Sequence, residues 1–144
     1  MPNNGNRFRH ALAEYIRSWG DGLEVAEEKY IGWRFIGTPR KLDVVVMNPA
    51  NCRSMAIEAK LQETAGSAFE KLSYALDDCL AAPIPSIIVF SGKHIRDDMK
   101  AKLISSGHGI EVGFQDGVVE DRHLLLKQRV YIELGMNYFP FLRP

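Results

Sequence analysis

Two apolar runs that flank a short turn constrain the fold of this 144-residue chain more than any other feature. Residues 41–47, Lys-Leu-Asp-Val-Val-Val-Met, and residues 55–61, Met-Ala-Ile-Glu-Ala-Lys-Leu, have the length and composition of strands. Between them, Asn48-Pro49-Ala50-Asn51 has the composition of a turn. The pattern predicts a β-hairpin. Asp43 interrupts its first apolar run, although a carboxylate is rarely buried without a partner.

The remaining elements place this hairpin in an α/β domain. Apolar residues at helical spacing predict helices at residues 6–19 and 67–80, and we also expect a polar helix at residues 94–106 and a helix at residues 118–133. Further strand-like runs lie at residues 30–36, 86–91 and 110–114. The second helix opens with Ser67-Ala68-Phe69-Glu70, which has the form of a capping box. We therefore expect a helix, three strands that pair as a meander, and then alternating helices and strands, in a mixed sheet flanked by helices.

The length fits a single domain over residues 1–144. The apolar segment 135–144 is expected to be a tail that packs on its own core or covers a partner subunit. No apolar run reaches the roughly 18 residues of a membrane span, and the first residues lack the apolar stretch of a signal peptide. These features predict a cytoplasmic location and no membrane partner.

Composition excludes several classes of function. Cys52 and Cys79 lack a CxxC spacing, and the four histidines match no zinc motif, so we expect unpaired thiols and no zinc site. The chain has neither a GxGxxG nor a GxxxxGK[ST] nucleotide loop. Its net charge is zero, which argues against a basic coat for nucleic acid. An acidic excess, with six acidic and three basic residues, lies in residues 42–82.

That acidic segment contains the residues best suited to chemistry. Strand alternation places Glu58 and Lys60 on one face, which Gln62 continues. A hairpin can bring Asp43 beside Glu58, because opposed side chains lie about 5 Å apart. Paired carboxylates suit Mg²⁺, and a nearby lysine can orient a water molecule or stabilise a phosphorane. The alternative is a solvated strand face with ordinary charges.

Asp43, then Glu58-Ala59-Lys60 after a hairpin, preceded by a helix that carries Glu14, resembles the PD-(D/E)xK nuclease superfamily. The resemblance covers about residues 6–115, and Leu42 stands where the motif expects proline. It implies a restriction-endonuclease-like core with the element order αβββαβ. It also implies that Asp43, Glu58 and the backbone carbonyl of Ala59 hold Mg²⁺, with Mn²⁺ as a possible substitute. Lys60 would then contact the attacking water and the scissile phosphate.

The activity that this resemblance implies is Mg²⁺-dependent hydrolysis of DNA phosphodiesters to 5′-phosphate and 3′-hydroxyl ends, in a restriction, homing or phage system. One compact site cuts one strand, so we expect a homo-oligomer, a dimer or higher, for cutting a duplex. Two alternatives stay open. One is a structure-specific nuclease for junctions or repair, and the other is a non-catalytic DNA-binding subunit with the same fold.

Other residues are weaker candidates for the site. Glu14 and Gln62 are candidate catalytic residues, although Glu14 lies opposite the apolar stripe of its helix and a solvated face is its alternative. Candidate DNA-backbone contacts are Lys71 and Tyr74, on the polar side of the second helix, and Arg40 and Lys41 at a turn. Ordinary surface is the alternative for all four.

Overall fold

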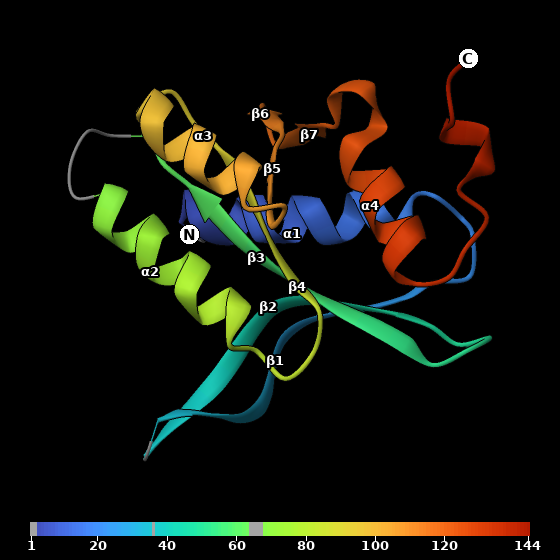
Figure 1. The fold of residues 1–144 in the computed structure, drawn as a ribbon, viewed down its shortest axis with the longest axis horizontal. Helices are drawn as coiled ribbons and strands as arrows, with labels where there is room; N and C mark the ends of the chain where they lie inside the picture. Colours follow the sequence, from blue (N-terminus) through green and yellow to red (C-terminus); the bar gives the residue numbers. More distant parts are fainter. Residues whose placement is uncertain (1–2, 36, 64–67) are drawn as a thin grey trace.

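The computed structural model describes residues 3–35, 37–63 and 68–144, which form a sheet between two layers of helices (Figure 1). The helices are α1 Asn4–Arg17, α2 Ala68–Leu80, α3 Asp97–Ser105 and α4 Leu125–Glu133, with short 3-10 helices η1 Arg122–Leu124 and η2 Phe139–Phe141. The strands are β1 Glu24–Phe35, β2 Thr38–Asn48, β3 Arg53–Leu61, β4 Ser86–Ser91, β5 Gly109–Glu111, β6 Gly113–Gln115 and β7 Val118–Glu120.

The main sheet has five strands in the order β1-β2-β3-β4-β5. The pairs β1–β2 and β2–β3 are antiparallel, whereas β3–β4 and β4–β5 are parallel and are connected through α2 and α3. Strands β6 and β7 form a separate two-stranded sheet. The predicted mixed sheet, its meander of three strands and its flanking helices are therefore confirmed.

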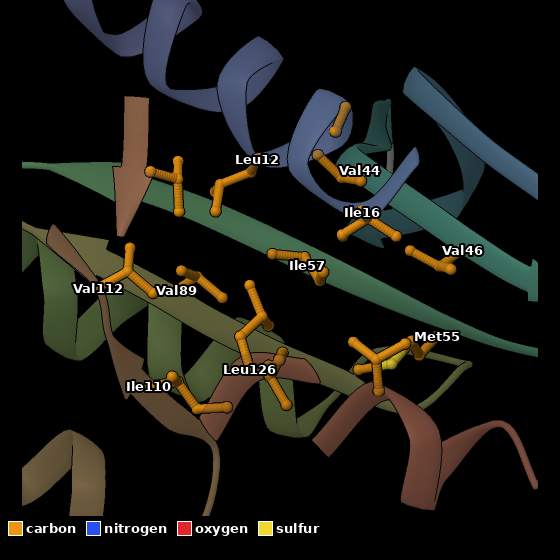
Figure 2. Packing of buried hydrophobic residues seen from close by; sticks show 14 of the residues in the cluster. Leu12, Ile16, Val44, Val46, Met55, Ile57, Val89, Ile110, Val112 and Leu126 are labelled. Carbon is orange, nitrogen blue, oxygen red and sulfur yellow. The ribbon is translucent and has the colours of Figure 1, made fainter. Parts of the chain in front are cut away.

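Strand alternation divides the core into two clusters, one on each face of the sheet. On one face, α1 and α4 pack against Val44, Ile57 and Val89; Figure 2 shows Leu12, Ile16 and Leu126 among these strand residues. On the other face, Ile88 and Phe90 pack against α2 and α3. Because β3 and β4 are covered on both faces, polar groups that face the helices must find partners there.

The C-terminal half differs from the sequence prediction. The expected helix over 118–133 is wrong at its start, because residues 118–120 form β7 and α4 begins only at Leu125. The cause is Asp116-Gly117, whose positive φ angles of 53° and 76° form a two-residue hairpin turn between β6 and β7. The expected strand over 110–114 is likewise divided between β5 and β6.

The other boundaries shift by a few residues. Helix α1 begins at Asn4 because the side chain of Asn3 accepts a hydrogen bond from the Asn6 N–H at 2.7 Å and caps the helix. Strand β1 begins at Glu24, earlier than its aromatic run predicts. The predicted cap at Ser67 lies outside the described residues. Within the described part of the chain, no helix combines the length and apolar character that a membrane span requires.

The segment after α4 contacts the body of the protein. Asn48, the last residue of β2, and Asn51, in the turn that follows it, donate side-chain hydrogen bonds to the Leu134 carbonyl, each at 2.9 Å. The ring centroids of Phe141 and Tyr131 lie 5.5 Å apart. Phe139 remains 67% exposed. The tail therefore packs on its own domain in part, and its role in a subunit interface stays a prediction.

The carboxylate of Glu27 in β1 attaches this strand to α1. Arg9, His10 and Arg17 of α1 approach it at 3.4, 3.1 and 3.3 Å. Burial alone would raise the pKa of Glu27, but the hydrogen bonds from His10, Arg17 and Arg9 together hold it below its usual value. The ionised form of Glu27 therefore stabilises the fold.

Leu12 lies on the inner face of α1 and is fully buried, so its truncation tests the packing of this helix. We expect Leu12→Ala to lower the free energy of unfolding by about 2 to 5 kcal/mol through the lost apolar contact and the cavity left behind. Leu80→Ala, at a side chain that is 58% exposed, is the matched control and should change it by less than about 0.5 kcal/mol. Urea denaturation measures both, and equal losses would contradict the assigned core.

Replacement of Glu27 tests its ion pairs. A carboxylate with a lowered folded pKa stabilises the protein above its unfolded pKa of about 4.5, and this contribution is lost as the pH falls through the folded pKa. We expect Glu27→Gln to cost about 1 kcal/mol at neutral pH and to weaken the acid-dependent loss of stability. Denaturation at neutral and acid pH, with the exposed Glu24→Gln as control, measures this difference. An unchanged pH dependence would count against it.

Candidate active site

Strands β2 and β3 separate at Asp43 and Glu58. Their last paired residues on this side are Val44 and Ile57; beyond them β2 continues only against β1, and β3 continues against β4. One further step of the same register would set Asp43 opposite Glu58. Asp43 Oδ2 instead accepts a hydrogen bond from the Ala59 N–H at 2.9 Å. We call this separation point, with Asp43, Glu58 and Lys60, the fork.

Glu58 and Lys60 lie side by side at the fork, with 3.2 Å between Glu58 Oε1 and Lys60 Nζ. Burial raises the pKa of Glu58, and the negative charge of Asp43 raises it further, while Lys60 opposes both effects. Two neighbouring carboxylates provide the hard oxygen ligands that a divalent cation binds. Their donor set therefore fits Mg²⁺ or Mn²⁺, with water completing the coordination.

Helix α2 forms one wall of the site. Its buried Leu72 and Leu76 pack on the sheet, which turns Lys71 and Tyr74 outward as the sequence predicts. Together with α2, the fork and β1 enclose an open hollow of about 260 Å³, lined by Arg34, Glu58, Lys60, Lys71, Tyr74, Ala75 and Asp78. The fork is thus open to solvent on the α2 side, beside a lysine and a tyrosine that is 72% exposed.

Asp78 connects α2 to the β1–β2 hairpin. Its carboxylate accepts from Arg40 at 2.8 Å and pairs with Arg34 at 3.2 Å, and its carbonyl also accepts from Arg40. Arg40 is only 5% exposed. The expectation that Arg40 contacts DNA is therefore corrected, because this residue lies within β2 and its guanidinium is buried against α2.

The contacts described for three other predicted residues involve neither Asp43 nor Glu58. Lys41 pairs with Glu28 at 2.8 Å. Gln62 follows β3, where its backbone N–H donates to the Ser91 carbonyl at 3.0 Å, and a Cβ on the adjacent Gly92 would stand 2.0 Å from the Gln62 carbonyl oxygen. Glu14 is 56% exposed and pairs with Arg17 at 2.7 Å.

The structure does not bring Glu14 to Asp43 and Glu58. Helix α1 packs its apolar stripe on the Val44 and Ile57 face of the sheet and leaves Glu14 among solvent-exposed basic residues. In the described ranges, no three His, Cys, Asp or Glu side chains gather as a metal site. Glu14 is therefore left out of the candidate site, which contains two carboxylates.

Sequence reasoning missed Arg34 and Asp78. Asp78 follows Lys71 by seven residues, so the helical period alone could have placed it on the same side of α2. Arg34 gave no such signal, because the register of β1 against β2 shifts between Tyr30 and Trp33 and again before Phe35. Such irregularities decide which face a strand residue occupies.

Comparison with known proteins supports this reading of the fold. A family model described as a PD-(D/E)XK nuclease superfamily domain matches residues 4–119. The crystal structure of a protein of unknown function, AF1548, has a TM-score of 0.53 at 13% identity and covers 90% of this chain and 78% of that chain. A structure of an EndoMS–dsDNA2 complex has a TM-score of 0.35 at 15% identity, over 73% of this chain and 45% of that chain. No curated protein matches the sequence.

Removal of Asp78 tests the contact between α2 and the hairpin. Asp78→Ala would leave the buried guanidinium of Arg40 without its carboxylate, so we expect the free energy of unfolding to fall by about 3 kcal/mol or more. Asp77→Ala, at the exposed neighbouring position, is the matched control and should change it by less than about 0.5 kcal/mol. If chemical denaturation gives the same value for both variants, Asp78 does not hold Arg40.

Proposed function

This chain belongs to the PD-(D/E)XK nuclease superfamily, and we propose that it is an Mg²⁺-dependent endodeoxyribonuclease whose reaction takes place at the fork. The observation that carries the proposal is the meeting of Asp43, Glu58 and Lys60 where β2 and β3 separate, beside a hollow open to solvent. A structural role alone gives no reason to set two carboxylates against each other in a half-buried position.

Asp43, Glu58 and the carbonyl of Ala59 would hold the metal ion. When bound, such an ion lowers the pKa of a coordinated water and neutralises charge that develops on phosphorus. The ammonium of Lys60, held beside Glu58, would orient the attacking water and contact the scissile phosphate. In-line attack by this water on phosphorus, with departure of the 3′ oxygen, leaves 5′-phosphate and 3′-hydroxyl ends.

The residues around the hollow supply contacts to the DNA backbone in this proposal. Lys71 is exposed at the start of α2 and can approach a phosphate without losing a buried partner. The hydroxyl of Tyr74 offers a neutral hydrogen bond next to it. Arg34 contributes positive charge on the opposite side, although it shares Asp78 with Arg40. These groups fix the position of a strand without reading its sequence.

A homo-oligomer belongs to the same proposal, since one fork cuts one strand and a symmetric pair of forks is the simplest arrangement that cuts two. A second candidate, a nuclease that recognises DNA structure rather than sequence, is favoured by the exposed aromatic side chains of β1, Tyr30 and Trp33.

Incubation with supercoiled plasmid and with a four-way junction tests the nuclease function, in Mg²⁺ and in chelator. We expect Mg²⁺-dependent cutting that falls at least about a hundredfold in Asp43→Asn, Glu58→Gln and Lys60→Ala, because each removes a metal ligand or the positioned ammonium. Lys93→Ala, at an exposed lysine after β4, is the control and should cut as the wild type does.

The substrates separate the alternatives. Cutting of the plasmid at few positions indicates sequence specificity, and cutting of the junction alone indicates a structure-specific enzyme. A folded wild-type protein that binds DNA but cuts neither substrate would replace the enzyme with a non-catalytic DNA-binding subunit.

A further inference from the structure

The outer half of the β1–β2 hairpin, residues 29–35 and 38–41, extends away from the helices (Figure 1). We call this part the arm. Residues 29 to 34 are all exposed, and among them Tyr30 is 64% and Trp33 66% exposed. An exposed tryptophan next to an exposed tyrosine, on a ribbon that projects from the domain, is a costly surface in water and marks a contact with a partner.

The two faces of the arm differ. Burial along β2 alternates, so that Arg40 and Leu42 are buried while Pro39 is exposed and Lys41 half-buried. The buried face is attached to α2 through Asp78. Tyr30 and Trp33 pair with Lys41 and Pro39, two β2 residues that share the other face. The aromatic residues therefore belong to the open face of the arm.

The charge of the arm identifies the chemistry of the partner. Lys29, Arg34, Arg40 and Lys41 are basic and the arm contains no acidic residue, in a chain whose net charge is zero. Two carboxylates outside the arm, Asp78 and Glu28, pair with three of these cations, so positive charge remains in excess. A basic ribbon with exposed aromatic rings fits a nucleic acid, whose phosphates are anionic and whose bases offer flat faces.

The arm is continuous with the fork. Arg34 lines the same hollow as Glu58 and Lys60. Lys41, which pairs with Tyr30 across the ribbon, lies two residues before Asp43 on the same strand. By strand alternation Lys41 and Asp43 share one face of β2, so a DNA strand bound at Asp43 can continue onto the open face of the arm, whereas Arg34 reaches the hollow from the α2 side.

The side chains of the arm favour stacking over the reading of base edges. Edge recognition in a groove relies on polar side chains such as Arg, Lys, Asn and Gln, and residues 30–33 of the arm include none of these. The outermost residues of β1 include Tyr30, Ile31, Gly32 and Trp33, and the guanidinium of Arg34 is paired with Asp78. Aromatic rings bind the faces of bases, and those faces are accessible only where bases are unpaired.

We propose that the arm binds DNA that contains unpaired bases, with Trp33 stacking on a base close to the bond that the fork cuts. This inference rests on the proposed nuclease function and narrows its substrate class to DNA with a bubble, a flap or a single-stranded segment. Tyr30 supports the same strand from the neighbouring position of the open face.

Binding of labelled DNA in chelator tests the arm separately from cutting. Three probes of the same sequence are compared by fluorescence anisotropy: single-stranded, fully paired, and paired with a central bubble. We expect the wild type to bind the bubble about tenfold more tightly than the paired duplex, and Trp33→Ala to lose about tenfold or more on the bubble. Trp33→Phe, which keeps an aromatic ring, should stay within about threefold of the wild type.

Phe139→Ala, at an aromatic residue of the tail that is 67% exposed, is the matched control and should bind as the wild type does. Equal affinity of the wild type for bubble and paired duplex overturns the inference, as does wild-type binding by Trp33→Ala. If the wild type cuts DNA in Mg²⁺ but Trp33→Ala binds the bubble as the wild type does, the proposed role of the arm is wrong and the proposed nuclease function stands. If binding depends on Trp33 but the wild type does not cut DNA, the proposed role of the arm stands and the proposed nuclease function is wrong.

Discussion

The hydrogen bond from the Ala59 N–H to the Asp43 carboxylate is the contact on which the rest of the site depends. Where a strand leaves its neighbour inside a sheet, the backbone groups that lose their ladder partners need others. Asp43 supplies one from its side chain, so β2 can turn toward β1 while β3 stays paired with β4. The same separation admits solvent and places a second carboxylate, Glu58, beside the first.

Charge is distributed around this point in two different ways. On the strands, Glu58 is held in a position that disfavours its ionised form, and Lys60 compensates only in part. On α2, Asp78 is matched by two guanidinium groups, Arg34 and Arg40, and its contacts are structural. The carboxylate that we propose as a metal ligand and a structural carboxylate thus lie in the same small region. Their partners distinguish them: Glu58 has the Asp43 carboxylate as a neighbour, and Asp78 is paired with two guanidinium groups.

The sequence predicted the hairpin, the strand over residues 86–91 and the alternation around Glu58, because apolar periodicity and turn residues are local signals. It failed where a short signal was overlooked, at Asp116-Gly117, whose turn replaces the start of the expected last helix by β7. It could not place Glu14 or Arg40. The position of each depends on which face of the sheet α1 or α2 covers, and that choice is made by tertiary packing rather than by spacing.

The close approach of Gly92 to the Gln62 carbonyl has a consequence for how variants of this protein would be interpreted. Any side chain at position 92 must displace the end of β3, and Lys60 is only two residues away along that strand. In a survey of random substitutions, position 92 would therefore be scored among the essential residues although it contributes no reactive atom. Intolerance to mutation at position 92 would reflect the close spacing between the ends of β3 and β4. An assignment of catalytic groups based on such a survey alone would wrongly include Gly92.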